Sequence, residues 1–199
     1  MNIRASAIVC GVRAYGETAV IVRMLTADYG MLAAYVAGGR GRVLSPVVIP
    51  GNLVDAQLSA RSDNQLPFAR LELVQSRGPW LSEPLPAAAI NWSTALAVSC
   101  LPERQPFPAL YEALSGLLEA ICVAPSARGW AMPLLSYEVL LMRELGYGSP
   151  VARPESDDWT TVLDTFDLLG MQLARYPLAD QRGDVMAART MLRERLARI

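Results

Sequence analysis

The chain contains no histidine and no lysine, and only three cysteines among its 199 residues. Without histidine, the commonest general base and the usual nucleophile–histidine triads are missing. Without lysine, Schiff-base chemistry and the phosphate-binding lysine of a P-loop are excluded. Cys10, Cys100 and Cys122 lie far apart and form no CxxC pair, which predicts buried apolar side chains rather than a zinc site or a disulfide framework. We therefore expect no metal, no cofactor and no enzymatic activity.

Long apolar runs are missing as well. No stretch of about 18 apolar residues is present, so we expect no membrane span. The short apolar patch near the N-terminus is interrupted by Gly11 and Arg13, which makes it a poor signal peptide. These features predict a cytoplasmic protein. Apolar residues make up 52% of the chain and charged residues 19%, a balance typical of a globular protein of one or two domains.

The first part of the chain has the pattern of a β-structure. Short runs rich in Val, Ala, Leu and Ile are separated by Gly, Asn, Asp and Pro. The expected strands are Ala5–Arg13, Thr18–Thr26, Gly30–Ala37, Leu53–Ala60 and Phe68–Ser76. The expected turns are Ala27–Gly30, where Gly30 can take a positive φ, and Ser62–Asn64. Five short strands suit a small, partly open barrel of the OB type, and an SH3-like barrel fits the same pattern almost as well.

The pattern changes after Gly78, where Pro79, Pro84 and Pro86 indicate a linker. The expected helices are Ala87–Cys100, Pro108–Val123, Trp130–Leu145, Asp158–Tyr176 and Asp184–Arg198. The third is apolar nearly all round, with Gly146 as its expected C-terminal cap. We predict an α+β protein: a five-stranded β-barrel of the OB type over residues 1–78, then a helical bundle over residues 79–199.

Charge divides along the same boundary. Residues 1–77 hold eight arginines and five acids, a net charge of +3, whereas residues 78–199 hold ten arginines and fourteen acids, a net charge of −4. Every basic side chain is thus a planar guanidinium that can bind phosphate or carboxylate with two parallel hydrogen bonds. The overall charge of −1 therefore hides a basic barrel.

A glycine-rich segment, Gly38–Arg42, carries Arg40 and Arg42. Its glycines let the backbone approach a ligand closely, and its arginines can bind phosphate oxygens. The alternative is a solvated, mobile loop. Arg13, Tyr15 and Arg23 form a second candidate patch, in which Tyr15 either stacks on a base or packs on the barrel rim. The full predicted nucleic-acid-binding set is Arg13, Tyr15, Arg23, Arg40, Arg42 and Arg61.

Two features of the helical half also bear on function. Arg189 and Arg193 lie one turn apart on the last expected helix, where they either complement the helix dipole or form a cationic seat for an acidic peptide tail. Asp157 and Asp158 precede Trp159, and placement at a helix start explains them better than catalysis does. Glu138 lies on a mostly apolar helix and needs a partner of its own.

Two motifs in this order resemble the bacterial RecO family of recombination mediators. The first is Tyr15-Gly16-Glu17-Thr18, followed by Leu-Thr at 25–26, Gly30, and Gly38 with Arg40 and Arg42. The second is YEVLLMRELGYG at residues 137–148, similar to the family's "LLGYG" helix end. Many relatives carry a four-cysteine zinc subdomain after this turn, but residues 149–199 contain no cysteine. The resemblance therefore implies a zinc-free, shortened member.

The resemblance implies an OB-fold followed by a helical bundle. It also implies binding to single- and double-stranded DNA, annealing of complementary strands, and work with RecR and single-stranded DNA-binding protein to load RecA. The acidic C-terminal tail of the single-strand-binding protein would dock on the helical half. Two alternatives stay open from the residues alone: an RNA-binding OB-fold protein, and a non-enzymatic interaction scaffold.

Overall fold

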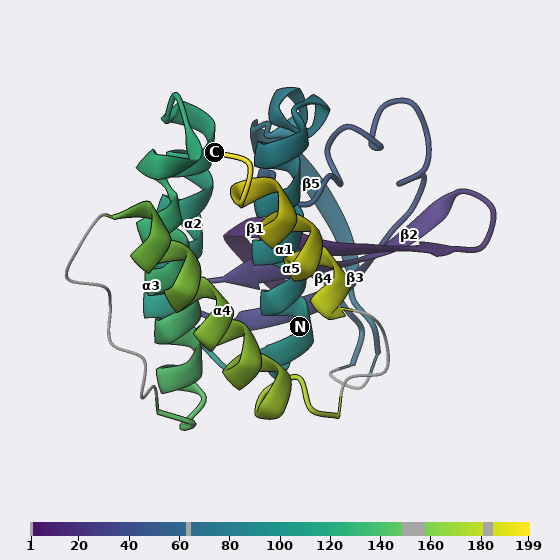
Figure 1. The fold of residues 1–199 in the computed structure, drawn as a ribbon. Coiled ribbons are helices and arrows are strands. Elements are labelled where there is room, and N and C mark those ends of the chain that lie inside the picture. The colour runs from purple at the N-terminus through teal and green to yellow at the C-terminus, as the bar shows by residue number, and fades with distance from the viewer. Residues whose placement is uncertain (1, 63–64, 149–157, 181–184) are drawn as a thin grey trace. The chain divides into compact units, whose positions relative to one another are not determined.

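The computed structural model describes residues 2–62, 65–148, 158–180 and 185–199 (Figure 1). Their backbone contacts divide the chain into two compact units, which are considered separately. The barrel unit comprises Met1–Ser82 and Leu101–Tyr111, and the helical unit comprises Glu83–Cys100 and Glu112–Ile199. The barrel unit therefore includes residues 101–111, which the sequence analysis placed in the helical domain.

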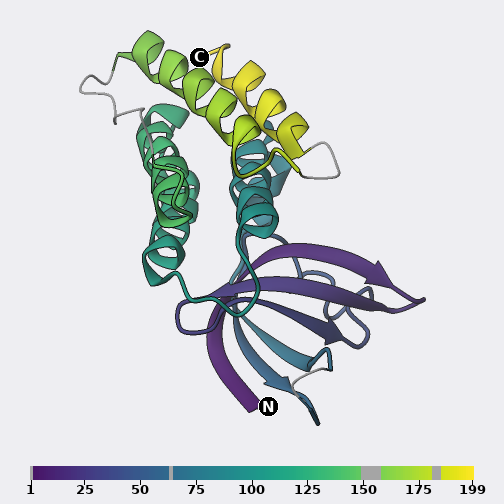
Figure 2. The same cartoon turned by 90° about the horizontal axis from the view of Figure 1, so that it is seen from below.

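Five strands close into a barrel in the order β1-β2-β3-β5-β4 (Figure 2). They are β1 Asn2–Tyr15, β2 Ala19–Thr26, β3 Gly30–Val36, β4 Leu53–Ser59 and β5 Phe68–Gln75. Neighbouring strands are antiparallel except β3 and β5, which are parallel. This order is the Greek-key arrangement of the OB-fold. The OB-fold prediction is thus confirmed, and the SH3-like alternative is set aside.

Alternation along the strands builds the barrel interior. On β2, Val20, Val22 and Met24 are at most 4% exposed and belong to the core, as the period-2 pattern predicts. Ile21 and Arg23 lie on the outer face of the same strand and are half-buried. Apolar side chains from all five strands fill the interior, so the barrel is packed and has no room for a ligand among these core residues.

The return segment, residues 101–111, covers one end of the outer surface of the barrel. Glu103 forms a parallel bridge with Met31 of β3, and the backbone N–H of Arg104 donates to the Met31 carbonyl at 2.9 Å. Gly30 has a φ of +68°, as expected for the turn between β2 and β3. A Cβ at Gly30 would overlap the backbone of Gln105, so this glycine is needed for the close approach as well as for the turn.

Five α-helices follow the barrel strands, each close to its predicted range. They are α1 Pro84–Cys100, α2 Pro108–Val123, α3 Ala131–Glu144, α4 Trp159–Arg175 and α5 Val185–Leu196. The predicted linker is shorter than expected, because Pro84 and Pro86 lie in the first turn of α1, where proline costs no hydrogen bond. A short 3-10 helix, Gly78–Ser82, precedes α1.

The helix ends follow their expected chemistry. The Asp158 carboxylate accepts a hydrogen bond from the Thr161 backbone N–H at 3.1 Å and caps α4, while Asp157 lies outside the described residues. Gly146 follows α3 with a φ of +82°, the left-handed conformation predicted for its cap. Among the described residues, no helix is long and apolar enough to cross a membrane.

Candidate nucleic-acid interface

The strand registers place most of the predicted site on one outer surface of the barrel. Arg13 of β1 pairs with Ile21 of β2, Ile21 pairs with Tyr35 of β3, and Tyr35 pairs with Phe68 of β5. Directly paired residues project from the same side of a sheet, so these four side chains form one row across four strands. Arg13 and Phe68 mark the two ends of this row.

Two more predicted residues share this side. Tyr15 lies two residues after Arg13 on β1, and Arg23 lies two residues after Ile21 on β2, so the period of two keeps both on the outer surface. We call the surface formed by Arg13, Tyr15, Arg23, Tyr35 and Phe68 the outer face. Its strands include β2 and β3, the part of an OB-fold that commonly binds oligonucleotides.

Aromatic rings form a continuous line on the outer face. The Tyr15 ring meets the Tyr35 ring edge to face with centroids 5.8 Å apart, and Tyr35 meets Phe68 in the same way at 5.0 Å. Tyr15 is 53% exposed and Phe68 is 62% exposed, so both present ring surface to solvent. Tyr15 thus packs on the barrel rim and still exposes ring surface, so the structure is compatible with both predicted roles, rim packing and base stacking.

The sequence analysis missed Tyr35 and Phe68. Tyr35 could have been assigned, because it alternates with the buried Ala34 and Val36 and must therefore face outward. Phe68 could not, because its place beside Tyr35 depends on the pairing of two strands that are distant in sequence.

The glycine-rich segment is attached to the turn between β1 and β2. The Arg40 backbone N–H donates to the Thr18 carbonyl at 2.9 Å, and its Nη1 donates to the carbonyls of Glu17 at 3.1 Å and Gly16 at 3.4 Å. Gly38 has a φ of +67°, and a Cβ at Gly39 would overlap the Val20 side chain. The glycines therefore bring the start of the segment against the barrel, while residues 40–43 remain exposed to solvent.

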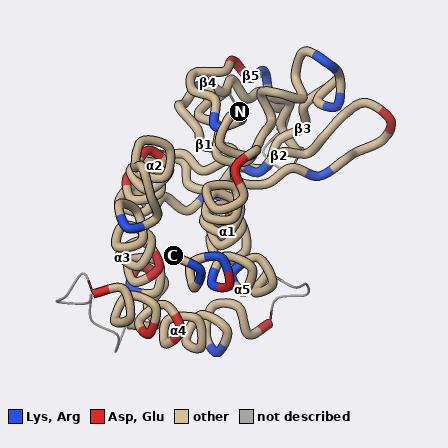
Figure 3. Tube along the Cα trace, turned by 45° about the horizontal axis from the view of Figure 1, so that its top comes forward, with Lys and Arg blue, Asp and Glu red and all other residues tan. Residues whose placement is uncertain are grey.

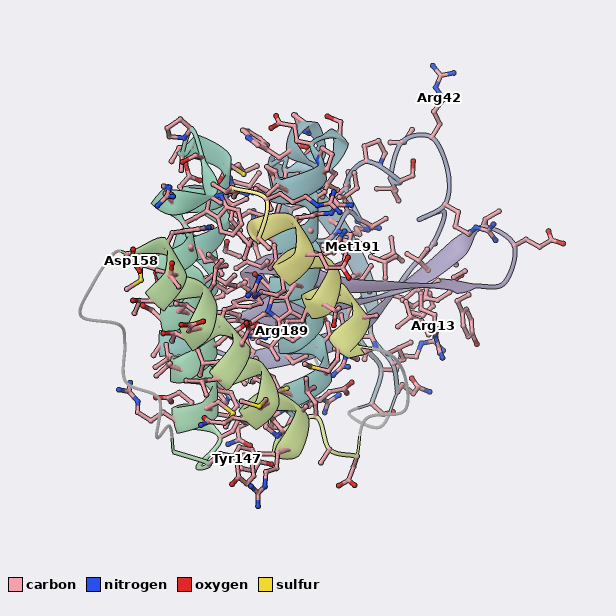
Figure 4. The ribbon with its side chains drawn as sticks, in the orientation of Figure 1. Arg13, Arg42, Tyr147, Asp158, Arg189 and Met191 are labelled. Carbon is pink, nitrogen blue, oxygen red and sulfur yellow. The ribbon has the colours of Figure 1, made fainter. Side chains whose placement is uncertain are left out.

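Arg42 and Arg61 extend the site at its loops. Arg42 is exposed, and its side chain points away from the ribbon (Figure 4). Arg61 is exposed on the connection between β4 and β5, and it lines the same hollow as Phe68. Figure 3 shows the arginines distributed over the strands and loops of the barrel. Ring contacts thus link Tyr15, Tyr35 and Phe68, the hollow adds Arg61, and Arg40 is bound to the turn that follows Tyr15.

Most of these arginines are not neutralised by a carboxylate within the described part of the chain. Among the described residues, Arg13, Arg40, Arg42 and Arg61 form no ion pair with a carboxylate. Arg23 is the exception, because its Nε lies 3.8 Å from the Glu103 carboxylate of the return segment. The outer face is therefore cationic along the β1 strand and the loops, and partly neutralised where the return segment begins.

Arg189 has a different environment from the one expected for a partner site. Its side chain is 4% exposed, and its Nε and Nη2 donate to the Glu138 carboxylate at 3.1 and 2.8 Å. Nη2 also donates to the Phe166 carbonyl at 2.6 Å, and the Trp92 indole donates to Glu138 at 2.7 Å. Figure 4 shows Arg189 among the helices. Its guanidinium is fully engaged inside the helical unit and is not offered to an acidic tail.

Arg193 lies nearer the surface but is also engaged. Its Nε and Nη2 each donate to one oxygen of the Asp167 carboxylate at 2.8 Å, so the pair is bidentate. The hypothesis of a cationic seat on α5 is therefore corrected at the buried Arg189, and at the partly exposed Arg193 it stays a prediction. Glu138, an acid in the middle of a mostly apolar helix, was the sequence signal for this arrangement, because it required a buried partner.

Burial keeps two of the three cysteines, Cys10 and Cys100, unreactive. Burial raises the pKa of the Cys10 thiol to about 12, and burial likewise raises the pKa of Cys100 to about 12. Both therefore remain neutral thiols near pH 7, and a neutral thiol is neither a nucleophile nor a metal ligand.

A closed OB barrel followed in sequence by a helical unit places the chain in the class of α+β proteins with an N-terminal OB-fold. Comparison with known proteins makes the assignment more specific. Residues 1–77 match the family model described as "Recombination protein O N terminal", and residues 83–153 match "Recombination protein O C terminal". The chain belongs to the RecO family, as the two sequence motifs indicated.

Three curated relatives show the extent of the similarity, and each is named "DNA repair protein RecO". The protein of Ruegeria sp. (strain TM1040) is 36% identical over 149 residues, which cover 74% of this chain and 61% of the relative. That of Rhodospirillum centenum is 38% identical over 143 residues, covering 71% and 56%. That of Phenylobacterium zucineum is 35% identical over 155 residues, covering 77% and 62%. The chain therefore spans about 60% of the length of these relatives.

Proposed function

We propose that this protein is a non-enzymatic mediator of recombinational DNA repair that binds DNA through the outer face of its barrel. The observation that carries the proposal is the row from Arg13 to Phe68, which joins a cation to exposed aromatic rings across four strands. Residues 1–78 would supply the DNA-binding domain, and residues 79–199 the helical domain that contacts partner proteins. We place its work in the cytoplasm, at the nucleoid.

The chemistry of the face favours the sugar–phosphate backbone over base sequence. Guanidinium groups bind phosphate oxygens with two parallel hydrogen bonds, and Arg42 extends from a loop where it can reach a strand crossing the face. Aromatic rings stack on any base. Binding by such a surface has little sequence preference and weakens with salt, with a log–log slope of about −0.7 per phosphate neutralised for single strands.

Annealing follows from the same surface without covalent chemistry. Two complementary strands repel one another through their phosphates, and a protein that neutralises part of that charge lowers the barrier to pairing. In the repair reaction that we propose, the protein anneals single strands and, with RecR and single-stranded DNA-binding protein, promotes loading of RecA. The repair role named for the curated relatives supports this proposal.

A salt titration tests the binding surface. We would measure binding of a labelled oligo-dT and an unrelated sequence by fluorescence anisotropy, for the wild type and for Arg13→Ala/Arg42→Ala. The double variant should lose affinity for both oligonucleotides and show a shallower salt slope, by about 0.7 for each lost phosphate contact. Arg198→Ala, a matched loss of one exposed arginine from the helical unit, is the control and should bind as the wild type does. Unchanged affinity and slope in the double variant would rule out this surface.

Two further measurements separate the rival functions. Competition between DNA and RNA of matched sequence distinguishes a DNA-binding protein from an RNA-binding OB-fold protein. Single-strand annealing, measured with and without the cognate single-stranded DNA-binding protein and alongside a RecR pull-down, tests the mediator role. A protein that retains no DNA at low salt would instead be an interaction scaffold.

A further inference from the structure

We propose that Phe68 acts as a wedge that separates two successive unpaired bases of a bound single strand. Each base would enter one of two hollows that flank the Phe68 ring. This inference rests on the proposed DNA binding and extends it. It specifies which feature of the DNA the barrel recognises, namely a base that is neither paired nor stacked.

The Phe68 ring is held in place although it is exposed. Phe68 is the first residue of β5, and its backbone is fixed by the hydrogen bond from the Tyr35 N–H to the Pro67 carbonyl at 2.8 Å. The ring meets Tyr35 at 72° with centroids 5.0 Å apart, so one edge is supported while 62% of the residue remains exposed. A large ring that is supported and yet exposed is suited to stack on a ligand.

Two hollows meet at this ring. The first has a volume of about 970 Å³ and lies where β1, β4 and β5 reach one end of the barrel. The second has a volume of about 680 Å³ and lies along the connection between β4 and β5. Ser59 and Phe68 line both. Each volume falls in the range of roughly 300–1,000 Å³ that is typical of small-molecule sites, so each has room for a base.

The side chains of the hollows match the groups of a nucleotide. In the first, Gln57 supplies an amide for a base edge and Arg70 a cation for phosphate, while Leu58 and Leu71 face the barrel core and are at most 7% exposed. The second offers Gln65 and Arg61 in the same two roles, with Leu66 as exposed apolar surface. Gln57 pairs with Arg70 across β4 and β5, which places the amide and the cation side by side. Arg4, also in the first hollow, is already bound to Asp55 at 2.7 Å.

The arrangement selects for unpaired bases. Bases inside a duplex are stacked on their neighbours and paired, and removing one from the stack has an energetic cost that is smallest in a single strand. A ring inserted between two neighbouring bases therefore favours single-stranded over double-stranded DNA. Contacts from Arg13 and Arg42 to phosphates would still hold a duplex, since they do not require unstacking.

The test uses the full chain and a single-stranded oligonucleotide with two adjacent 2-aminopurines. Neighbouring 2-aminopurines give an exciton signal in circular dichroism that is lost when the two bases separate. Wild-type protein should abolish this signal, and Phe68→Leu should leave it in place. Phe68→Tyr keeps the ring and should behave as the wild type. Tyr29→Leu removes an exposed ring from the opposite end of β2 and β3 and is the matched control.

Affinities provide the second readout. Stacking on an aromatic ring contributes enough that Phe68→Leu should weaken single-strand binding roughly 5- to 150-fold, with duplex binding unchanged. An equal loss on single strands and duplex, or a persistent exciton signal with bound wild-type protein, would overturn the wedge while leaving DNA binding intact. Absence of any DNA binding by the wild type would overturn the proposed function and the wedge together.

Discussion

The buried pair of Arg189 and Glu138 allows a quantitative test of what holds the helical unit together. Glu138 is fully buried and Arg189 is 4% exposed, so each charge depends on the other for compensation. Removing one partner of a buried ion pair leaves an uncompensated charge and typically costs about 3–5 kcal/mol. Because whole domains are stable by about 5–15 kcal/mol, either Arg189→Met or Glu138→Leu should bring the helical unit close to unfolding.

The double variant is more informative than either single one. Arg189→Met combined with Glu138→Leu removes both charges, and similar replacements of buried ion pairs by apolar residues are often neutral or stabilising. It still leaves two polar groups without their partners, the Trp92 indole N–H and the Phe166 carbonyl, each costing about 1–3 kcal/mol. We therefore expect the double variant to be no less stable than the worse single variant, with a coupling energy of at least 1 kcal/mol.

Urea unfolding, followed by circular dichroism and tryptophan fluorescence, measures these stabilities. Trp92 lies at the pair and emits together with the three other tryptophans of the chain, so circular dichroism is the readout that all the variants share. Trp92→Phe serves as a control that removes one hydrogen bond but neither charge, and it should cost about 1–3 kcal/mol. Additive losses in the double variant, or single-variant losses below about 1 kcal/mol, would refute the view that the two charges depend on each other.

Three other predictions concern the barrel. Glu103→Gln should strengthen DNA binding at low salt, because it removes the acid 3.8 Å from Arg23, and anisotropy that shows equal or weaker binding would contradict this. Gly30→Ala should destabilise the barrel by more than 1 kcal/mol in urea unfolding, since it places a Cβ against Gln105 at a positive φ; a change within error would argue against the close approach. Burial raises the pKa of Cys10 to about 12, so this thiol should resist iodoacetamide at pH 8 until the protein unfolds, and peptide mass spectrometry showing rapid labelling of folded protein would disprove it.

The sequence was sufficient for the secondary structure because its signals are local. Alternation identified the buried side of β2, and glycine and aspartate identified the hairpin at Gly30 and the cap at Asp158. The sequence pattern left two barrel types open, the OB type and the SH3-like type. It could not decide between them, because the pairing of β3 with β5 depends on contacts between distant segments. The contact of the return segment with the barrel was unpredictable for the same reason, because α1 separates Glu103 from its partner Met31 in the sequence.

The candidate site could be predicted from the sequence only where the residue type and its neighbours favoured a single environment. Arginines beside glycines drew attention to Arg40 and Arg42, and both lie at the barrel surface. The function of Arg189 was not predictable in this way, because its partner Glu138 lies 51 residues earlier on another helix. Alternation with the buried Ala69 and Leu71 predicts that Phe68 faces outward, but its place beside Tyr35 depends on the pairing of β3 with β5, which has no local signal.

The parallel pairing of β3 with β5 has a consequence for how the barrel responds to a ligand. Among the described residues, Tyr35 and Phe68 are the one directly paired position between these two strands. This joint between β3 and β5 has fewer paired residues than any other pair of neighbouring strands in the barrel. It also carries the two aromatic rings that would contact a DNA strand. An oligonucleotide lying across it would hold the two edges together, so occupancy and closure would reinforce each other. Backbone amides at this joint should then exchange with deuterium more slowly once a single strand is bound.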